Sequence, residues 1–170
     1  MLDENRSERA IIILDMINKF AHVEGSCFTE ASVDVIPFLQ GEVQYFRERM
    51  RPVIFGNTGA TAPAILTERE QFDQQVIQPL SPRNGELLVR KTRPNAFFQT
   101  ELLDILLNLK IRNLTIVGAF SHTSVLMTAA SALDCGFSVV VPETCVYSQD
   151  PEDHAAALRL IHRWLNDHQQ

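Results

Sequence analysis

Two charged residues directly follow short apolar runs, where their side chains could take part in chemistry. Asp15 follows the β-branched run at residues 10–14, and Lys91 follows a shorter run at residues 86–90. A carboxylate beside a buried strand is poorly solvated, so its pKa can rise into the range that a general acid or base requires. The lysine ammonium could keep that carboxylate ionised, polarise a substrate oxygen or bind a substrate carboxylate. Each residue also has a structural interpretation, Asp15 as a turn cap and Lys91 as a solvated surface residue.

A third candidate segment is residues 117–125, which read Val-Gly-Ala-Phe-Ser-His-Thr-Ser-Val. It changes from a strand-like to a helix-like pattern, so amide groups at the helix start could bind an oxyanion. Ser124 could act as a nucleophile only if a nearby base activates it. His122 is a poor candidate for that base, because residues two positions apart on a helix do not face each other. For Ser121 and Ser124 the structural alternative is a helix cap and a packed first turn.

The remaining polar residues predict neither a metal site nor a cofactor site. The histidines are scattered, and none is spaced from Cys, Asp or Glu as in a familiar metal site. No glycine-rich loop that could cradle a phosphate is present. The three cysteines, Cys27, Cys135 and Cys145, are far apart. Their spacing favours reduced thiols in the cytoplasm over a disulfide framework.

Apolar runs alternate with helical stretches along the whole chain, a pattern typical of βα units and a mainly parallel sheet. The expected strands are residues 10–14, 52–55, 86–90, 113–118 and 137–141. The expected helices are residues 31–50, 67–77, 99–109, 121–135 and 153–166. We predict a single α/β domain over residues 1–170, a three-layer αβα sandwich around a Rossmann-like sheet of five to six strands. In such sheets ligands bind beyond the carboxyl ends of the strands, where Asp15 and Lys91 are expected.

Composition and charge exclude several kinds of partner. The chain has 170 residues and is 45% hydrophobic, with 15 Lys and Arg against 21 Asp and Glu and a net charge of -6. Nucleic-acid binding depends on clustered basic residues, which this acidic chain lacks. No apolar run approaches the roughly 20 residues needed to cross a bilayer, and the N-terminus lacks the order of a secretory signal. We therefore expect a cytoplasmic protein that binds a small molecule, and neither nucleic acid nor a membrane.

Three blocks, found in the same order along the chain, resemble the isochorismatase-like hydrolases. They are Leu-Asp-Met-Ile-Asn-Lys-Phe at residues 14–20, then Lys91 with Ala-Phe at 96–97 and Thr-Glu-Leu at 100–102, then residues 118–129. That superfamily includes isochorismatases, nicotinamidases and N-carbamoyl amidohydrolases. The resemblance spans most of the chain, and it implies a hydrolase with its active site at Asp15 and Lys91.

The resemblance implies a modified catalytic set. Amidases of the family use an Asp-Lys-Cys triad, and the position of the Cys is Ser124 in this chain. A serine is a much poorer nucleophile than a thiolate. Isochorismatases also lack the Cys, and hydrolysis of their vinyl ether bond needs a proton on carbon and attack by water, with no acyl intermediate. The resemblance therefore implies C–O cleavage of a small anionic substrate, with Asp15 as general acid and Lys91 beside the substrate.

Two alternatives remain open, a Ser124-dependent amide hydrolase and a catalytically impaired relative that acts as a binding or assembly module. The chain lacks the histidines that bind metal in nicotinamidases, so a metal-dependent nicotinamidase is not expected. The family further implies a homo-oligomer, either a dimer or a tetramer, and a cis peptide bond between Ala119 and Phe120. The residues expected to contact substrate are Phe20, Phe97, Ala119, Phe120, His122 and Thr123.

Overall fold

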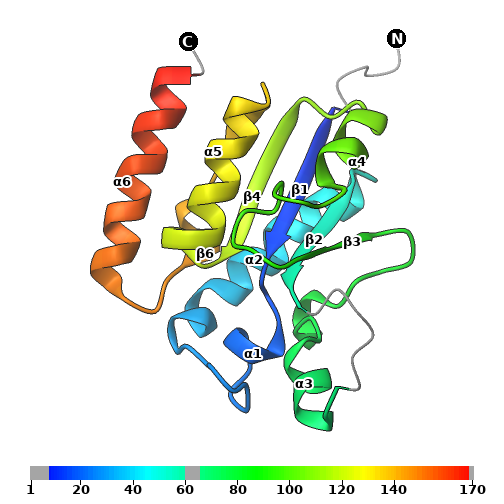
Figure 1. Cartoon of the computed structure of the whole chain (residues 1–170), viewed down its shortest axis with the longest axis vertical. Helices are drawn as coiled ribbons and strands as arrows, with labels where there is room; N and C mark the ends of the chain where they lie inside the picture. The colour runs from blue at the N-terminus through cyan, green and yellow to red at the C-terminus, as the bar shows by residue number, and fades with distance from the viewer. Residues whose placement is uncertain (1–7, 60–65, 169–170) are drawn as a thin grey trace.

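A parallel six-stranded sheet forms the centre of the computed structural model, which describes residues 8–59 and 66–168 (Figure 1). The strands lie in the order β3–β2–β1–β4–β5, and β6 also pairs with β4. Their bounds are Arg9–Leu14 for β1, Val53–Thr58 for β2, Leu87–Lys91 for β3, Asn113–Ala119 for β4, Ser138–Val140 for β5 and Val146–Tyr147 for β6. Because all paired strands are parallel, their carboxyl ends meet at one edge of the sheet.

Six α-helices connect or follow the strands. Their bounds are Asn18–Ala21 for α1, Ala31–Glu48 for α2, Glu68–Asp73 for α3, Leu102–Asn108 for α4, Leu126–Asp134 for α5 and Pro151–His168 for α6. Short helices are also present: 3-10 turns at Gln78–Leu80 and Glu143–Cys145, and a π-helical turn at Ser121–Val125. None of the helices in the described residues is long and apolar enough to cross a bilayer.

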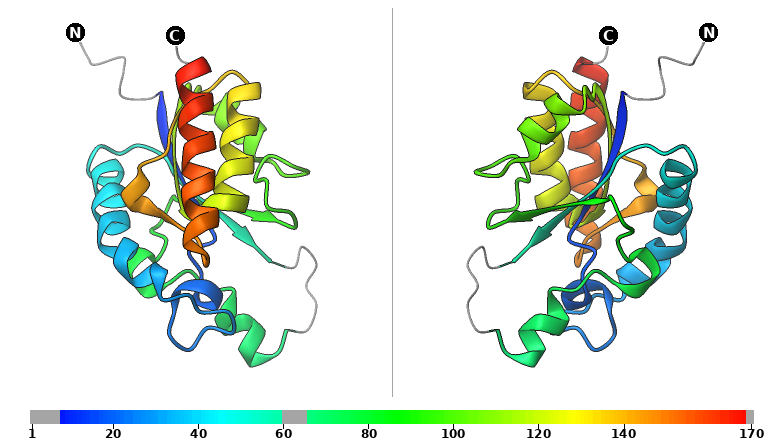
Figure 2. Two further views of the ribbon diagram at one scale, coloured as in Figure 1. Left: turned by 90° about the vertical axis from the view of Figure 1, so that its left-hand side faces the viewer. Right: turned by 90° about the vertical axis from the view of Figure 1, so that its right-hand side faces the viewer.

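The buried residues divide into two clusters, one on each face of the sheet. In β1, Ile12 packs in the same cluster as Leu106 of α4, together with residues of α5 and α6. Its neighbour Ile13 packs in the other cluster, with Leu39 of α2. Alternate residues of a strand face opposite sides, so a strand buried on both faces has to be apolar throughout. Figure 2 shows α2 on one side of the sheet and α4, α5 and α6 on the other, which confirms the expected three-layer sandwich.

The structure differs from the expected elements at several places near the strand ends. Strand β3 includes Lys91 as its last residue, whereas the sequence places the strand end one residue earlier. The helix expected at residues 121–135 is divided into the π-helical turn and α5. Strand β6 was not expected, because two residues are too few to show an alternating pattern. The cis peptide bond expected between Ala119 and Phe120 is confirmed.

Gly118 allows β1 and β4 to approach closely at the edge of the sheet. It pairs with Leu14 in the register of the two strands. Its φ is 106°, a backbone conformation that residues with a side chain rarely adopt. A Cβ atom on this residue would lie 2.2 Å from the carbonyl oxygen of Leu14. Since Leu14 precedes Asp15, the glycine brings the residues that follow β4 next to that carboxylate.

We expect Gly118→Ala to lower the free energy of unfolding by roughly 2–4 kcal/mol, because the new methyl group meets main-chain atoms at an unfavourable φ. Gly41→Ala is the matched control, since Gly41 lies inside α2 and a Cβ there meets nothing within 4 Å. That change is expected to raise the free energy of unfolding by about 0.5–1 kcal/mol. Urea denaturation of both variants measures the two values, and a loss of equal size in both would contradict the close approach of β1 and β4.

Candidate active site

Asp15, Lys91 and Ser124 meet at the carboxyl edge of the sheet and are almost completely buried. Their exposed fractions are 3%, 0% and 5%. The Lys91 Nζ lies 2.5 Å from Asp15 Oδ2 and 3.2 Å from Ser124 Oγ. The Ser124 hydroxyl donates to the same carboxylate oxygen over 2.8 Å. The three side chains therefore form a closed triangle of hydrogen bonds in which the carboxylate accepts from both neighbours.

Thr58, the last residue of β2, joins this triangle although it was not among the expected site residues. Its hydroxyl accepts from Lys91 Nζ over 2.9 Å, and its backbone N–H donates to Asp15 Oδ1 over 2.7 Å. An ammonium has three N–H groups, so Asp15, Thr58 and Ser124 account for all the donors of Lys91. A buried charge is tolerated only when it is paired and its remaining groups are hydrogen-bonded. Strand β2 extends three residues beyond the expected end at Phe55 and ends in the polar residues Asn57 and Thr58. Those two polar residues were the signal in the sequence that could have indicated Thr58.

The backbone of Asp15 is held in an unusual conformation. Its φ is 52°, in the left-handed region, which Asp and Asn adopt more readily than most residues. The Asp15 amide donates to the carbonyl of Gly56 over 3.1 Å, so the neighbouring strand fixes this conformation. Strained backbone of this kind persists where the surroundings enforce it, and such positions are common at active sites. Here it sets the direction of the carboxylate beyond the end of β1.

Aromatic side chains surround one side of the triangle. The ring centroid of Phe120 lies 5.1 Å from that of Phe20 and 5.6 Å from that of Tyr147, both in edge-on arrangements. The ring of Phe97 lies 6.1 Å from that of Phe137, and Phe97 packs against the cluster beneath α4, α5 and α6, on the other face of the sheet from Phe120. Contact of Phe97 with a substrate stays a prediction.

The Tyr147 hydroxyl is a buried hydrogen-bond donor close to the site. Among the described residues it has no hydrogen-bond partner. Burial, and to a smaller extent the negative charge of Asp15, raise the pKa of Tyr147 well above its usual value. The phenol therefore stays neutral, and it keeps a proton available for a substrate oxygen or a water molecule.

The turn after β4 uses several of its polar groups internally. The backbone amides of Thr123 and Val125 both donate to the Phe120 carbonyl over 3.1 Å, so these two are engaged within the turn. The His122 ring is stacked on Phe120 and its Nδ1 lies 2.6 Å from the Ser148 hydroxyl. Because the Ser124 hydroxyl donates to Asp15, the carboxylate is the group placed to act as its base.

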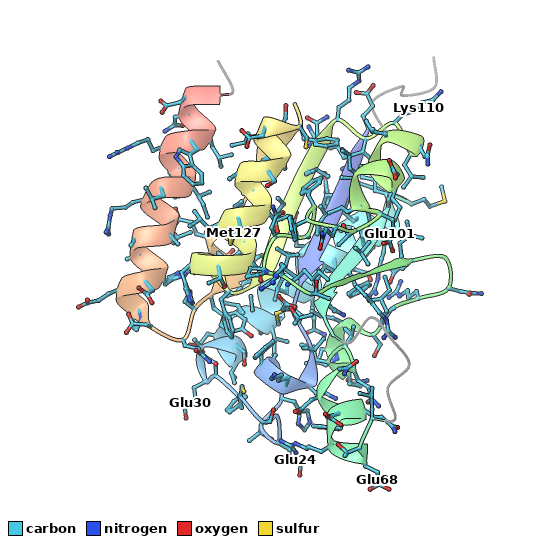
Figure 3. All side chains as sticks on the ribbon, in the orientation of Figure 1. Glu24, Glu30, Glu68, Glu101, Lys110 and Met127 are labelled. Carbon is cyan, nitrogen blue, oxygen red and sulfur yellow. The ribbon has the colours of Figure 1, made fainter. Side chains whose placement is uncertain are left out.

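A cavity of about 200 Å³ adjoins the triangle through Thr58. Lys19 and Phe20 line it from α1, and residues of α3 line its far side. Figure 1 shows α1 and α3 beyond the carboxyl end of β1, where they cover this edge of the sheet. Figure 3 shows Glu24, Glu30 and Glu68 pointing outward around the same end of the molecule. The cavity wall itself carries the positive charge of Lys19 beside the carboxyl groups of Glu70 and Asp73 of α3.

The carboxylate of Asp73 in the cavity wall is already paired with neighbouring side chains. Asp73 accepts hydrogen bonds from the side chain and the backbone of Ser26, and Arg69 lies 3.6 Å away. The hydrogen bond from Ser26 lowers the pKa of Asp73.

No group of His, Cys, Asp or Glu able to hold a metal ion occurs within residues 8–59 and 66–168. Larger cavities of about 490 and 530 Å³ lie away from the triangle, against Arg47 and against Met127.

Comparison with known proteins identifies the family of the chain. The isochorismatase domain family matches residues 9–169. The uncharacterised isochorismatase family protein YaaI of Bacillus subtilis is 25% identical over 95% of this chain and 92% of its own length. The secreted isochorismatase effector Isc1 of Verticillium dahliae is 26% identical over 84% of this chain and 74% of its own.

A solved structure shares the fold. The nicotinamidase PncA of Bacillus subtilis superimposes with a TM-score of 0.83, at 24% identity, over 94% of this chain and 97% of its own. That likeness concerns the fold, whereas the family match concerns the sequence and covers nearly all of it. The chain therefore belongs to the isochorismatase family of hydrolases.

Proposed function

We propose that this protein hydrolyses the vinyl ether C–O bond of a small anionic substrate such as isochorismate, with Asp15 as the group that transfers the proton. The observation that carries the proposal is the triangle itself, a buried carboxylate between an ammonium and a hydroxyl. The resemblance matches that serine to the cysteine of the family's amidases. This arrangement can hold and move a proton, but it lacks a strong nucleophile.

The reaction consumes one water molecule and needs no covalent intermediate. The proton goes to the terminal carbon of the vinyl ether, which produces an oxocarbenium ion. Water adds to that ion and loses a proton, and the resulting hemiketal breaks its C–O bond to release pyruvate and an alcohol. In this scheme the ion pair of Asp15 and Lys91 holds one transferable proton. It passes from the ammonium to the carboxylate over the 2.5 Å between them, and Asp15 then donates it to carbon as general acid. The proton lost by the attacking water returns to the pair and restores the ammonium and the carboxylate.

Attack by Ser124 is disfavoured by its surroundings. Its Oγ accepts a hydrogen bond from Lys91 Nζ while its proton points to Asp15. A bond donated by an ammonium draws electron density away from the serine oxygen, and a carboxylate is a weak base towards an alcohol. The hydroxyl is better suited to hold the Asp15 carboxylate in place than to form an ester with the substrate.

The substrate class is supported by the cavity and by one relative. Lys19 lines the cavity next to Thr58, where its ammonium can pair with a substrate carboxylate. The relative that matches 84% of this chain is described as an isochorismatase effector. Both observations favour a small acid that carries a vinyl ether.

A second candidate is an amide hydrolase with Ser124 as its nucleophile. It is favoured by the 2.8 Å hydrogen bond from Ser124 Oγ to Asp15, because a nucleophile and its base are expected within such a distance. The two candidates differ in whether the serine oxygen forms a bond to the substrate.

We expect Asp15→Asn to lower kcat for pyruvate release from isochorismate by about 10²–10⁴-fold, the usual contribution of a general acid. The change keeps the shape of the side chain but leaves Lys91 without its counter-ion, so the melting temperature of the variant is measured alongside. Turnover within a few-fold of the unsubstituted protein, in a variant that is folded, would contradict the role of Asp15.

Ser124→Ala separates the two candidates. If the vinyl ether is the substrate bond, we expect pyruvate release to remain within about 10-fold, because the variant loses the hydrogen bonds of Ser124 to Asp15 and from Lys91 but keeps the ion pair that transfers the proton. Ser124→Cys is the companion variant and restores the thiol of the amidases. Ammonia release from a panel of amides is measured for all three proteins. Amide hydrolysis that disappears in Ser124→Ala and increases in Ser124→Cys would replace the vinyl ether proposal with the second candidate.

A further inference from the structure

Four polar side chains behind the active-site turn form a continuous series of hydrogen bonds, which we call the serine–histidine chain. His154 Nδ1 lies 2.9 Å from Ser121 Oγ, Ser121 Oγ lies 2.6 Å from Ser148 Oγ, and Ser148 Oγ lies 2.6 Å from His122 Nδ1. Both serines are buried. The serine–histidine chain connects three elements: α6 carries His154, Ser148 follows β6, and the π-helical turn carries Ser121 and His122. That turn also carries Ser124.

The number of available protons limits which hydrogen-bonding states the serine–histidine chain can adopt. The backbone N–H of His122 also donates to Ser148 Oγ, over 3.4 Å, which leaves this hydroxyl one proton to give and one lone pair to share. Ser148 must then donate at one end and accept at the other. The hydrogen bonds of the described residues give Ser121 Oγ no partner beyond His154 and Ser148, so its own proton finds an acceptor only if Ser121 also donates at one end and accepts at the other. The three links between side chains need three protons, and the two hydroxyls supply two. One imidazole must therefore have a proton on Nδ1, and the other must lack it.

This count sets a limit on charge. An imidazolium has protons on both nitrogens, so one charged histidine can donate into the chain while the other accepts. Two charged histidines would bring four protons to three links, so either one link breaks or Ser121 accepts from both sides, and in both cases one buried proton loses its acceptor. The hydrogen bonds of the serine–histidine chain are therefore fully satisfied with no or one imidazolium, and they are not with two.

The charged groups around the two imidazoles lie mainly on the side of His154. Burial lowers the pKa of His154, and the negative charge of Glu143 partly opposes this. Glu143 is itself 3.1 Å from His162 of α6. Asp153 and Glu152 occupy the first turn of α6, and the face of His122 is covered by Phe120. A histidine with a lowered pKa favours the folded state when neutral, so this contribution is lost as the pH falls below the ordinary histidine value of about 6.5.

We propose that Ser121, Ser148 and His154 are positioning residues, which hold the π-helical turn and thus Ser124 against Asp15 as long as no more than one histidine of the chain is charged. His122 then belongs to this chain, and the substrate-binding role expected for it from the sequence is replaced by a positioning role. The inference rests on the proposed function only in so far as the turn is taken as part of the active site. The proton count itself depends on the hydrogen bonds alone.

The first test is independent of any substrate. Long-range ¹H–¹⁵N correlation spectra report which nitrogen of each histidine has the proton. At pH 7.5 we expect His122 and His154 to show opposite states at Nδ1, one protonated and one bare. Ser148→Ala removes the central hydroxyl, and we expect both rings in this variant to lose that fixed relation. The same tautomer in both histidines of the unsubstituted protein would overturn the proton count, whatever the enzyme hydrolyses.

The second test uses the turnover of isochorismate. In His154→Asn an amide group replaces Nδ1 and can either donate or accept, so the chain is retained without a titrating group at that end. We expect kcat near that of the unsubstituted protein, and a smaller decrease of kcat between pH 7 and pH 5. His154→Ala breaks the chain, and we expect roughly a 10-fold loss in kcat with little change in KM, about the value of one hydrogen bond.

His162→Asn is the matched control, because it removes another histidine of the same helix that is paired with Glu143 and lies outside the chain. We expect its pH profile of kcat to match that of the unsubstituted protein. Equal kcat in His154→Ala and His154→Asn, or a pH profile altered as much by His162→Asn, would overturn the positioning role. Opposite tautomers in a protein that releases no pyruvate would leave the chain established and contradict only the proposed function.

Discussion

The buried ion pair between Lys91 and Asp15 is the interaction on which the rest of the site depends. Neither charge is stable at this depth without the other, and the ammonium also needs acceptors for its two remaining protons. The sheet meets this need through its strand order, because β3, β2, β1 and β4 are consecutive neighbours. Each strand contributes one residue at or just after its carboxyl end. These residues are Lys91, Thr58, Asp15 and, in the turn that follows β4, Ser124. Four separate segments of the chain must fold together before any of these groups is satisfied.

The same constraint explains the unusual backbone at the edge of the sheet. Gly118 has no Cβ, which lets β4 lie against Leu14 and brings the turn after it next to the carboxylate. Asp15 has a positive φ that its bond to Gly56 maintains. Behind the turn, the buried hydroxyls of Ser121 and Ser148 link it to α6. The side chains of the candidate site are thus fixed by main-chain geometry on one side and by the serine–histidine chain on the other. This suits the proposed reaction, which depends on the placement of one proton.

The sequence predicted the parts of this account that depend on local patterns. Unbroken apolar runs indicated the buried parallel strands, and polar residues at their ends indicated Asp15, Lys91 and Ser124. Thr58 was missed because a threonine is ordinary inside a strand and the second strand was expected to end at Phe55. The bonds of Ser121 to Ser148 and to His154 join residues 27 and 33 positions apart, so no local spacing reveals them. The face of the sheet that Phe97 joins is likewise decided by packing and not by local spacing.

The central claim, proton transfer from Asp15 to a vinyl ether followed by attack of water, is tested most directly by tracing the atoms of the product. Isochorismate is hydrolysed by the purified protein in water enriched in both deuterium and ¹⁸O, and the products are examined by mass spectrometry before the carbonyl oxygen exchanges. The account predicts pyruvate with one deuterium in its methyl group and ¹⁸O at its ketone carbon, with no ¹⁸O in the alcohol. Incorporation of ¹⁸O into the alcohol, or release of no pyruvate at all, would contradict it.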